Sequence, residues 1–270
     1  MIDAVRLRAL QVRLLARAQK SPPGDWLPVL IGEAEVGVAN PDVASFLASA
    51  TPHFALVDYR LVLLDGDLDA TGRAAMLQDC ALRLRDAGMV RGWRDEQLAV
   101  RASPDTEPLA SIERAACRTL GITTTAVHLN AFTPAGELIV ARRAAHKQID
   151  PGLWDNLVGG MVPAGETELE ALAREAQEEA GLEIDGLALT RGGRVLVTRH
   201  VPEGFQSEIV QVFDALLPDG LSLRNQDGEV AAIERRSTTT VVESIERDEF
   251  TLESALVTLD GLLRRSGGST

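Results

Sequence analysis

The spacing of apolar and polar residues changes along the chain, and the change falls near residue 120. Before it, apolar residues recur every three to four positions, which is typical of amphipathic helices. This spacing predicts helices over 1–20, 42–50, 71–87 and 111–120. Alternation over 53–64 predicts one strand, and a shorter strand is expected over 98–101. The proline-containing stretch 102–108 is the best linker candidate.

After residue 120 the pattern favours strands joined by short turns. Two hairpins are expected, with strands over 124–133 and 137–143 and over 194–200 and 208–217. Helices are expected over 167–180 and 251–265, and no internal repeat is visible. We therefore predict an N-terminal α+β domain over 1–120 and a mixed α/β domain over 121–270.

Acidic residues outnumber basic ones in this 270-residue chain. The 40 Asp and Glu against 27 Lys and Arg give a formal net charge of −13. Nucleic-acid polymers and anionic membrane surfaces are bound by clusters of Lys and Arg. The charge therefore argues against both as partners. Six Phe, three Trp and one Tyr are also too few to suggest a base-stacking platform.

The cysteines and the first segment bear on location. Cys80 and Cys117 provide neither a disulfide framework nor a zinc-binding spacing, so a reduced cytoplasm is the simplest expectation. No apolar run reaches the roughly 20 residues that cross a bilayer. Segment 1–20 lacks the apolar core of a secretory signal. It is Arg-rich and acid-poor, as organelle presequences are, but its scarcity of Ser favours an amphipathic helix with a solvated basic face.

Three carboxylates gather on one face of the predicted helix 167–180. At about 100° per residue, Glu175, Glu178 and Glu179 share an arc of roughly 100° beside an apolar stripe. Like charges one turn apart repel by roughly 0.2–0.5 kcal/mol per pair, which Arg174 offsets only in part. Mg²⁺ or Mn²⁺, which prefer carboxylate oxygens, would remove the rest. The alternative is a solvated, salt-bridged helix face.

A glycine-rich loop before this helix favours the metal site over the solvated helix face, because glycine lets the backbone approach a ligand closely. Segment 160–182 fits the pattern G-x5-E-x7-R-E-U-x-E-E-x-G-U, in which U is apolar. All seven fixed positions are met, at Gly160, Glu166, Arg174, Glu175, Glu178, Glu179 and Gly181. Such a match arises by chance with a probability of ~10⁻⁸ per starting residue. The chain therefore resembles the Nudix hydrolases, although Ala176 is smaller than the usual aliphatic residue.

The resemblance implies a fold and a reaction. Nudix hydrolases form an α/β/α sandwich around a mixed sheet, and they cleave a diphosphate linked to another moiety with metal-activated water. By position in the pattern, Glu175 and Glu179 would be the main ligands of Mg²⁺ or Mn²⁺, and Glu178 a ligand or a close neighbour. Glu175 would also help to deprotonate the water. The remaining roles are ligation by the Gly160 carbonyl, orientation of a glutamate by Arg174 and support of the loop by Glu166.

A further acid outside the pattern is a candidate metal ligand. Glu229 follows an Asn-Gln-Asp-Gly turn and begins the next apolar segment, so we prefer it to Asp227. An ordinary turn with an exposed glutamate is an equal alternative.

A basic patch stands just before the pattern. Arg142, Arg143 and Lys147 are suited to hold substrate phosphates, and plain surface charge is the alternative. Trp154 is either a core residue or a stacking wall for substrate, and the first is favoured. Asn156 is a further substrate-binding candidate, because it completes a run that is similar to Nudix enzymes of non-nucleotide diphosphates.

Shorter motifs resemble a narrower group of Nudix proteins. Among them are Gly92-Trp93-Arg94-Asp95-Glu96 and Val127-His128-Leu129-Asn130. This group carries an N-terminal domain, DUF4743, and includes the Nudix part of fungal thiamine-pyrophosphokinase-fused proteins. The resemblance implies thiamine diphosphate or its oxidised analogues as substrate, hydrolysed to the monophosphate. The chain departs from the group at Asn130-Ala131-Phe132, where a Gly-aromatic pair is usual.

Other functions remain as alternatives. The chain could act on nucleoside diphosphate derivatives. An isomerase of the isopentenyl-diphosphate type would need a cysteine near 154–160, where there is none, and non-catalytic Nudix-fold modules usually lose the glutamates kept here. For the N-terminal domain, covering the substrate, forming a homodimer and stabilising the fold are three open roles.

Overall fold

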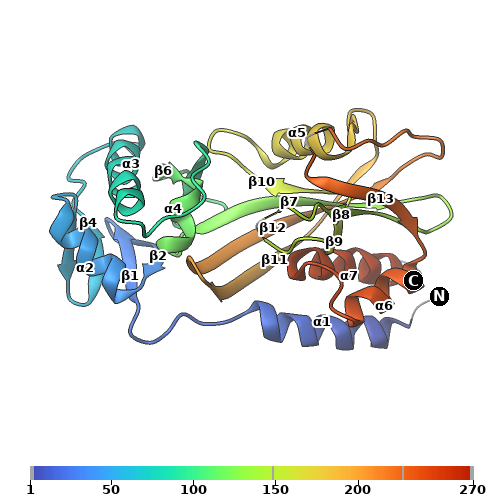
Figure 1. The fold of residues 1–270 in the computed structure, drawn as a ribbon, viewed down its shortest axis with the longest axis horizontal. Helices are drawn as coiled ribbons and strands as arrows, with labels where there is room; N and C mark the ends of the chain where they lie inside the picture. The colour runs from blue at the N-terminus through green and yellow to red at the C-terminus, as the bar shows by residue number, and fades with distance from the viewer. Residues whose placement is uncertain (1–2, 148, 227, 268–270) are drawn as a thin grey trace.

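The computed structural model describes residues 3–147, 149–226 and 228–267. Two groups of elements lie side by side along the long axis of the molecule (Figure 1). The first group has a four-stranded sheet in the order β2-β1-β4-β3 and a separate β5-β6 pair. Its elements are β1 (Leu27–Ile31), β2 (Ala34–Ala39), α2 (Pro41–Ala50), β3 (Phe54–Val57), β4 (Arg60–Leu63), α3 (Ala70–Asp86), β5 (Gln97–Val100), β6 (Ala110–Glu113) and α4 (Arg114–Thr119).

The prediction of a single strand over 53–64 is wrong. Strands β3 and β4 pair antiparallel across Asp58 and Tyr59, whose φ angles are 47° and 59°. Two successive residues with positive φ are what a two-residue hairpin turn of this kind requires. The Asn-Gly or Asp-Gly pair that usually signals such a turn is absent, so the alternation continues unbroken through it. The pattern also misses β1 and β2.

The helix predicted over 111–120 covers two elements. Strand β6 ends at Glu113, and α4 begins at Arg114. The Glu113 carboxylate accepts a hydrogen bond from the Ala115 N–H at 3.2 Å, which caps the helix. The expected linker 102–108 is instead the loop of a hairpin, because β5 and β6 pair antiparallel from Gln97 to Val100.

The second group is built on a seven-stranded sheet. Its path runs β11-β12-β7-β8-β13, with β10 paired to β7 and β9 to β8. The β12–β7 pair is parallel and the others are antiparallel, so the sheet is mixed, and both predicted hairpins are confirmed. The strands are β7 (Thr123–Phe132), β8 (Leu138–Arg143), β9 (Trp154–Asn156), β10 (Val158–Met161), β11 (Leu189–Val201), β12 (Gly204–Leu216) and β13 (Val230–Arg236).

Helices cover both faces of this sheet (Figure 1). On one face α5 (Glu168–Ala180) packs Leu172 and Ala176 against the sheet. On the other lie α6 (Thr238–Glu246), which was not predicted, and α7 (Leu252–Gly267). The expected α/β/α sandwich with a small N-terminal α+β region is confirmed. Across 3–147, 149–226 and 228–267, no helix is long and apolar enough to span a membrane.

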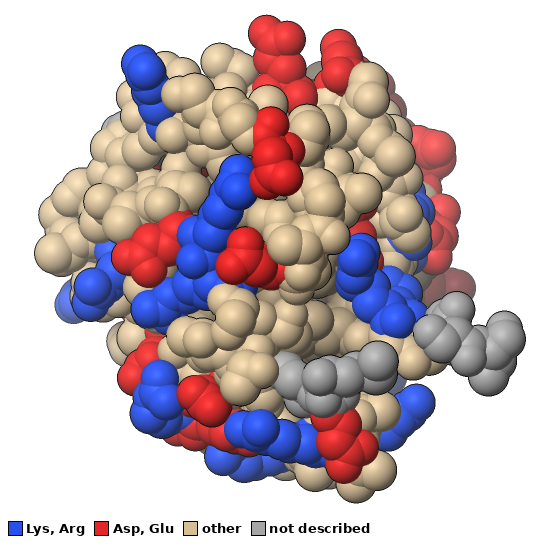
Figure 2. Space-filling model, turned by 90° about the vertical axis from the view of Figure 1, so that its right-hand side faces the viewer, with Lys and Arg blue, Asp and Glu red and all other residues tan. Residues whose placement is uncertain are grey.

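The first helix is confirmed as α1 (Ala4–Ala18), and it packs on the second group. Leu10 and Leu14 are buried in the same cluster as residues of α7. Its basic face is ion-paired as well as solvated, since Arg6 Nη2 lies 2.7 Å from Glu246 Oε2 and Arg17 pairs with Asp248. Basic and acidic side chains are interleaved on the end of the molecule shown in Figure 2. The domain division near residue 120 stays a prediction.

Candidate active site

Helix α5 begins and ends where the sequence predicts. The Thr167 hydroxyl accepts a hydrogen bond from the Glu170 N–H at 3.2 Å, and the Glu170 carboxylate accepts one from the Thr167 N–H at 2.8 Å. Gly181 ends the helix with a φ of 59°, a left-handed conformation that glycine adopts without strain. With Leu172 and Ala176 fully buried, the helix is a rigid support for the carboxylates on its other face.

Strand β10 lies against α5, and its glycines make this contact close. A Cβ atom on Gly160 would lie 2.0 Å from Glu175 Cδ and 2.1 Å from its Oε1. A Cβ atom on Gly159 would lie 2.9 Å from the His128 ring. The Gly159 N–H donates to Glu179 Oε2 at 2.9 Å. Glycine is therefore required at 160 because the Glu175 carboxylate occupies the space of a side chain.

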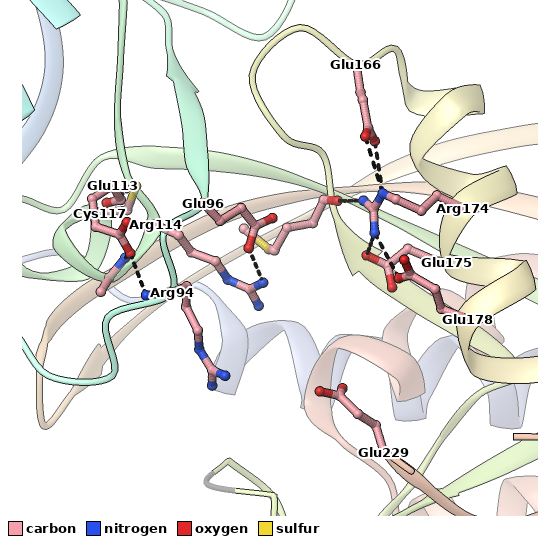
Figure 3. A network of polar contacts seen from close by, with 12 residues as sticks. Arg94, Glu96, Glu113, Arg114, Cys117, Glu166, Arg174, Glu175, Glu178 and Glu229 are labelled. Carbon is pink, nitrogen blue, oxygen red and sulfur yellow. Dashed lines mark hydrogen bonds and ion pairs between the residues drawn. The ribbon is translucent and has the colours of Figure 1, made fainter. Parts of the chain in front are cut away.

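Arg174 ties the loop to the helix (Figure 3). Its Nε donates to the Glu166 carboxylate at 3.3 Å, and its Nη1 donates to Glu175 at 2.8 Å and to Glu178 at 3.2 Å. Its Nη2 donates to the Met161 carbonyl at 3.2 Å. One guanidinium thus holds three of the acids in the sequence pattern, which is the geometry expected if Arg174 orients glutamates and Glu166 supports the loop.

Burial makes the charged forms of two of these acids costly. It raises the pKa of Glu175, against the effect of the adjacent Arg174. It raises the pKa of Glu179 to about 8, and the charges of Asp155 and Glu175 act in the same direction. The Gly159 N–H and Lys147 oppose this shift. A cation close to Glu179 would therefore be strongly favoured at neutral pH.

These acids line a cavity of about 670 Å³ between the two groups of elements. Glu175, Glu178 and Glu179 face it from α5, and Glu229 and Lys147 face it from the loops beside β13 and β8. Residues of the first group close the opposite side. The arrangement suits a small ligand that a metal ion and several charged side chains hold together.

Comparison with known proteins agrees with this geometry. The NUDIX domain matches residues 122–256, which is half of the chain. The chain belongs to the Nudix family. As a Nudix hydrolase it is a pyrophosphohydrolase. A second match, to the domain of unknown function DUF4743, covers residues 9–124.

Relatives of this Nudix hydrolase share both parts of the chain. Nudix hydrolase 24, chloroplastic, of Arabidopsis thaliana is 28% identical over 258 residues, which is 89% of this chain and 68% of the relative. Nudix hydrolase 20, chloroplastic, of the same plant is 28% identical over 265 residues, with the same coverage. Among solved structures, DR0079 from Deinococcus radiodurans is 25% identical with a TM-score of 0.49, and the match covers 63% of this chain and 98% of that one.

The donors of the Nudix site fit a hard divalent cation, which Nudix hydrolases generally use. Within the described residues, no three His, Cys, Asp or Glu side chains already stand in a metal-binding arrangement. Glu175 and Glu178 instead point toward Arg174 (Figure 3). Carboxylate oxygens are the ligands that Mg²⁺ and Mn²⁺ prefer. Burial raises the pKa of Glu179, and a divalent cation beside this carboxylate would favour its charged form.

Three residues predicted outside the Nudix pattern do join the cavity. Lys147 and Glu229 both line it, and their side chains form an ion pair with each other. Arg143 lines it too, and its Nη1 lies 3.0 Å from Asp155 Oδ2. Asp227, the alternative to Glu229, lies outside the described residues. A candidate metal ligand and a candidate phosphate-binding lysine are therefore neighbours in one site.

Three other predicted substrate-binding residues do not line the large cavity. Trp154 is buried in the core, with the Arg236 guanidinium 3.9 Å and the Arg142 guanidinium 5.6 Å from its ring centroid. Asn156 is 3% exposed, and its amide bonds to His128 Nδ1 at 2.8 Å and to Asn130 Oδ1 at 2.9 Å. Asn156 therefore orients the His128 ring, which does line the cavity.

The sequence reasoning missed several cavity residues. Arg94, Arg114 and Arg118 reach it from the first group, and Glu208 and Glu253 lie deep in its wall. Arg94 lies in the motif Gly92-Trp93-Arg94-Asp95-Glu96, but nothing in the sequence assigns a binding role to any of the three arginines. Glu208 is a charged residue on β12, a strand that is largely buried. Such a residue is a weak signal of function that could have been noticed in the sequence.

Proposed function

We propose that this chain hydrolyses the diphosphate bond of a small molecule, with Mg²⁺ or Mn²⁺ bound by Glu175, Glu178, Glu179 and Glu229. The observation that carries the proposal is the face of α5, where three carboxylates meet the cavity beside the Gly160 backbone. A bound divalent ion neutralises phosphate oxygens and lowers the pKa of the attacking water. The Gly160 carbonyl would complete the ligand set.

The chain's own residues position these groups. Arg174 holds the Glu175 and Glu178 carboxylates from one side, so their oxygens stay at the cavity surface. Glu175, whose burial raises its pKa, is suited to accept a proton from water. Lys147 and Arg143 face the same cavity and supply charges for phosphate oxygens.

For the organic part of the substrate, we propose thiamine or one of its oxidised forms. Four acids outside the Nudix pattern line the cavity in addition to Glu229 and the aspartates: Glu96, Glu203, Glu208 and Glu253. Glu208 is 9% exposed, and burial raises its pKa although the charges of Arg118 and Arg114 lower it, so its carboxyl group is suited to accept a hydrogen bond from an N–H-donating or cationic ligand. The thiazolium ring and amino group of thiamine are such partners. No Phe, Trp or Tyr among the described residues lines the cavity to stack a nucleobase.

The test is a substrate panel with Mg²⁺ and with Mn²⁺. Thiamine diphosphate and its oxidised analogues are compared with ADP-ribose and nucleoside di- and triphosphates. We expect release of the monophosphate from a thiamine compound, with kcat/KM at least about tenfold above the nucleotides. A panel in which nothing is cleaved refutes the hydrolase. Preferred cleavage of ADP-ribose assigns the enzyme to nucleoside diphosphate derivatives instead.

Variants test the roles. Glu179→Gln should lower kcat at least about a hundredfold, since a metal-bound site supplies several kcal/mol. Glu183→Gln is the matched control, because Glu183 is an exposed acid just after α5 and outside the cavity. Wild-type turnover in Glu179→Gln would contradict the metal-site assignment. Lys147→Ala should raise KM about tenfold, and an unchanged KM would contradict its contact with phosphate.

A further inference from the structure

The cavity has walls of opposite charge, and the positive wall comes from the first group of elements. Arg91 and Arg94 lie in the loop before β5, and Arg114 and Arg118 lie one turn apart on α4. Glu96 is the one acid among the described first-group residues that line the cavity, so this wall carries four positive charges against one negative. The wall from the second group carries nine acids against four Lys and Arg.

A buried carboxylate fixes the position of this positive wall. Glu113 is fully buried, and its Oε1 accepts hydrogen bonds from the backbone N–H of Arg94 at 2.9 Å and of Ala115 at 3.2 Å. The loop that carries Arg94 and the first turn of α4 are thus tied to one group. Figure 3 shows Arg94 and Arg114 extending from this side toward the side where Glu175 and Glu229 lie. The backbone that carries Arg94 and Arg114 is therefore held in place by the fold.

Three of the four arginines form no ion pair within the described part of the protein. Arg114 Nη1 pairs with Glu96 Oε2 at 2.7 Å. Among the residues that the structure describes, the guanidinium groups of Arg91, Arg94 and Arg118 form no hydrogen bond or ion pair, and Arg118 is near enough to Glu208 for its charge to lower the pKa of that acid. In a chain with a net charge of −13, cations left unpaired in a cavity full of acids are unusual. A guanidinium presents a planar set of donors that matches phosphate oxygens.

We propose that the N-terminal unit binds a phosphate group of the substrate through Arg94 and Arg118, opposite the glutamates of α5. This inference rests on the proposed function, because it takes the ligand of the cavity to be a diphosphate. One diphosphate would then contact both walls, with some of its oxygens facing the glutamates of α5 that would hold the metal and others facing the arginines. The N-terminal unit thereby completes the binding site and contributes to affinity for the substrate.

The experiment is isothermal titration of the full chain with inorganic pyrophosphate in EDTA. Without divalent ions the glutamates repel the anion, so its affinity has to come from basic side chains. Arg94→Ala and Arg118→Ala should each weaken binding about tenfold or more. Arg60→Ala is the matched control, because Arg60 is an exposed arginine of the same unit on β4 and does not line the cavity. It should bind as the wild type does.

Two results would overturn the inference. One is a wild-type protein that binds no pyrophosphate in EDTA, and the other is unchanged affinity in both arginine variants with the wild-type melting temperature. Inorganic phosphate should bind more weakly than pyrophosphate, and equal affinity would overturn the assignment to a diphosphate. Failure of the proposed function has a different signature: pyrophosphate binds through the arginines, yet no diphosphate is cleaved with Mg²⁺ or Mn²⁺. Because the two arginines are replaced separately, each variant measures the contribution of one arginine to pyrophosphate affinity.

Discussion

Replacing Gly160 by alanine should lower activity sharply in a protein that still folds. The added Cβ would lie 2.0 Å from Glu175 Cδ and 2.1 Å from Oε1, whereas non-bonded carbon atoms approach to about 3.5–4.0 Å. The Glu175 carboxylate would therefore have to retreat by roughly 1.5 Å. Such a shift breaks its 2.8 Å bond with Arg174 and moves its oxygens away from the β10 backbone.

This shift should lower both the rate of the reaction and the stability of the fold. A misplacement of about 1 Å in a catalytic group costs about a hundredfold in rate, so kcat should fall roughly 10²- to 10³-fold. Stability should fall by about 1.5–3 kcal/mol, because the shift breaks the hydrogen bond between the charged groups of Glu175 and Arg174. Gly160 also lacks a positive φ, so alanine introduces no backbone strain there.

Steady-state kinetics with the cleaved diphosphate and Mg²⁺, together with urea unfolding, measure the two quantities. Gly24→Ala is the matched control, because a Cβ at Gly24 meets nothing within 4 Å. Its kcat and unfolding free energy should equal those of the wild type within error. A folded Gly160→Ala protein with kcat within about twofold of the wild type would refute the reasoning, since Glu175 would then not need its observed position.

Three further predictions concern stability. Burial raises the Glu179 pKa from 4.5 to about 8, so the folded state keeps a proton that the unfolded state releases. In EDTA the unfolding free energy should therefore fall as pH rises from about 4.5 to about 8. Glu179→Gln should remove this pH dependence of stability. An equal pH dependence in the variant would contradict the argument from burial. Leu14→Ala should lower the free energy of unfolding in urea by about 2–4 kcal/mol. The control Val12→Ala, at a position 67% exposed on the same helix, should change it little. Equal losses would mean that α1 does not pack on the second group as observed. Gly181→Ala should cost about 1–2 kcal/mol in the same assay, because alanine is strained at a φ of 59°, and an unchanged midpoint would disprove that strain.

Local patterns in the sequence were enough to predict the catalytic helix. Its caps, its apolar stripe and the spacing of Glu175, Glu178 and Glu179 all lie within a few turns, and helix geometry converts such spacing directly into a common face. The mixed α/β class of residues 121–270 was predictable for a related reason, since a helix with one apolar face can bury that face against the sheet of the two hairpins. The α/β/α sandwich itself was implied by the resemblance to Nudix hydrolases.

Local patterns failed to predict a turn that does not interrupt the alternation of apolar and polar residues. Asp58 and Tyr59 adopt positive φ without a glycine, so the hairpin of β3 and β4 looked like one strand. Segment 111–120 held a strand that pairs with residues 97–100, and that pairing joins parts of the chain that a window cannot compare.

The sequence by itself determined which carboxylates share the face of α5, because those residues are a few positions apart. Tertiary structure alone decided what stands opposite them. It placed Asn156 in the interior and brought Arg94 and Arg118 to the cavity of Glu175. Arg94 and Arg118 are 57 or more positions away from Glu175 along the chain. Their proximity depends on how two sheets and their helices pack, and no spacing within one element records it.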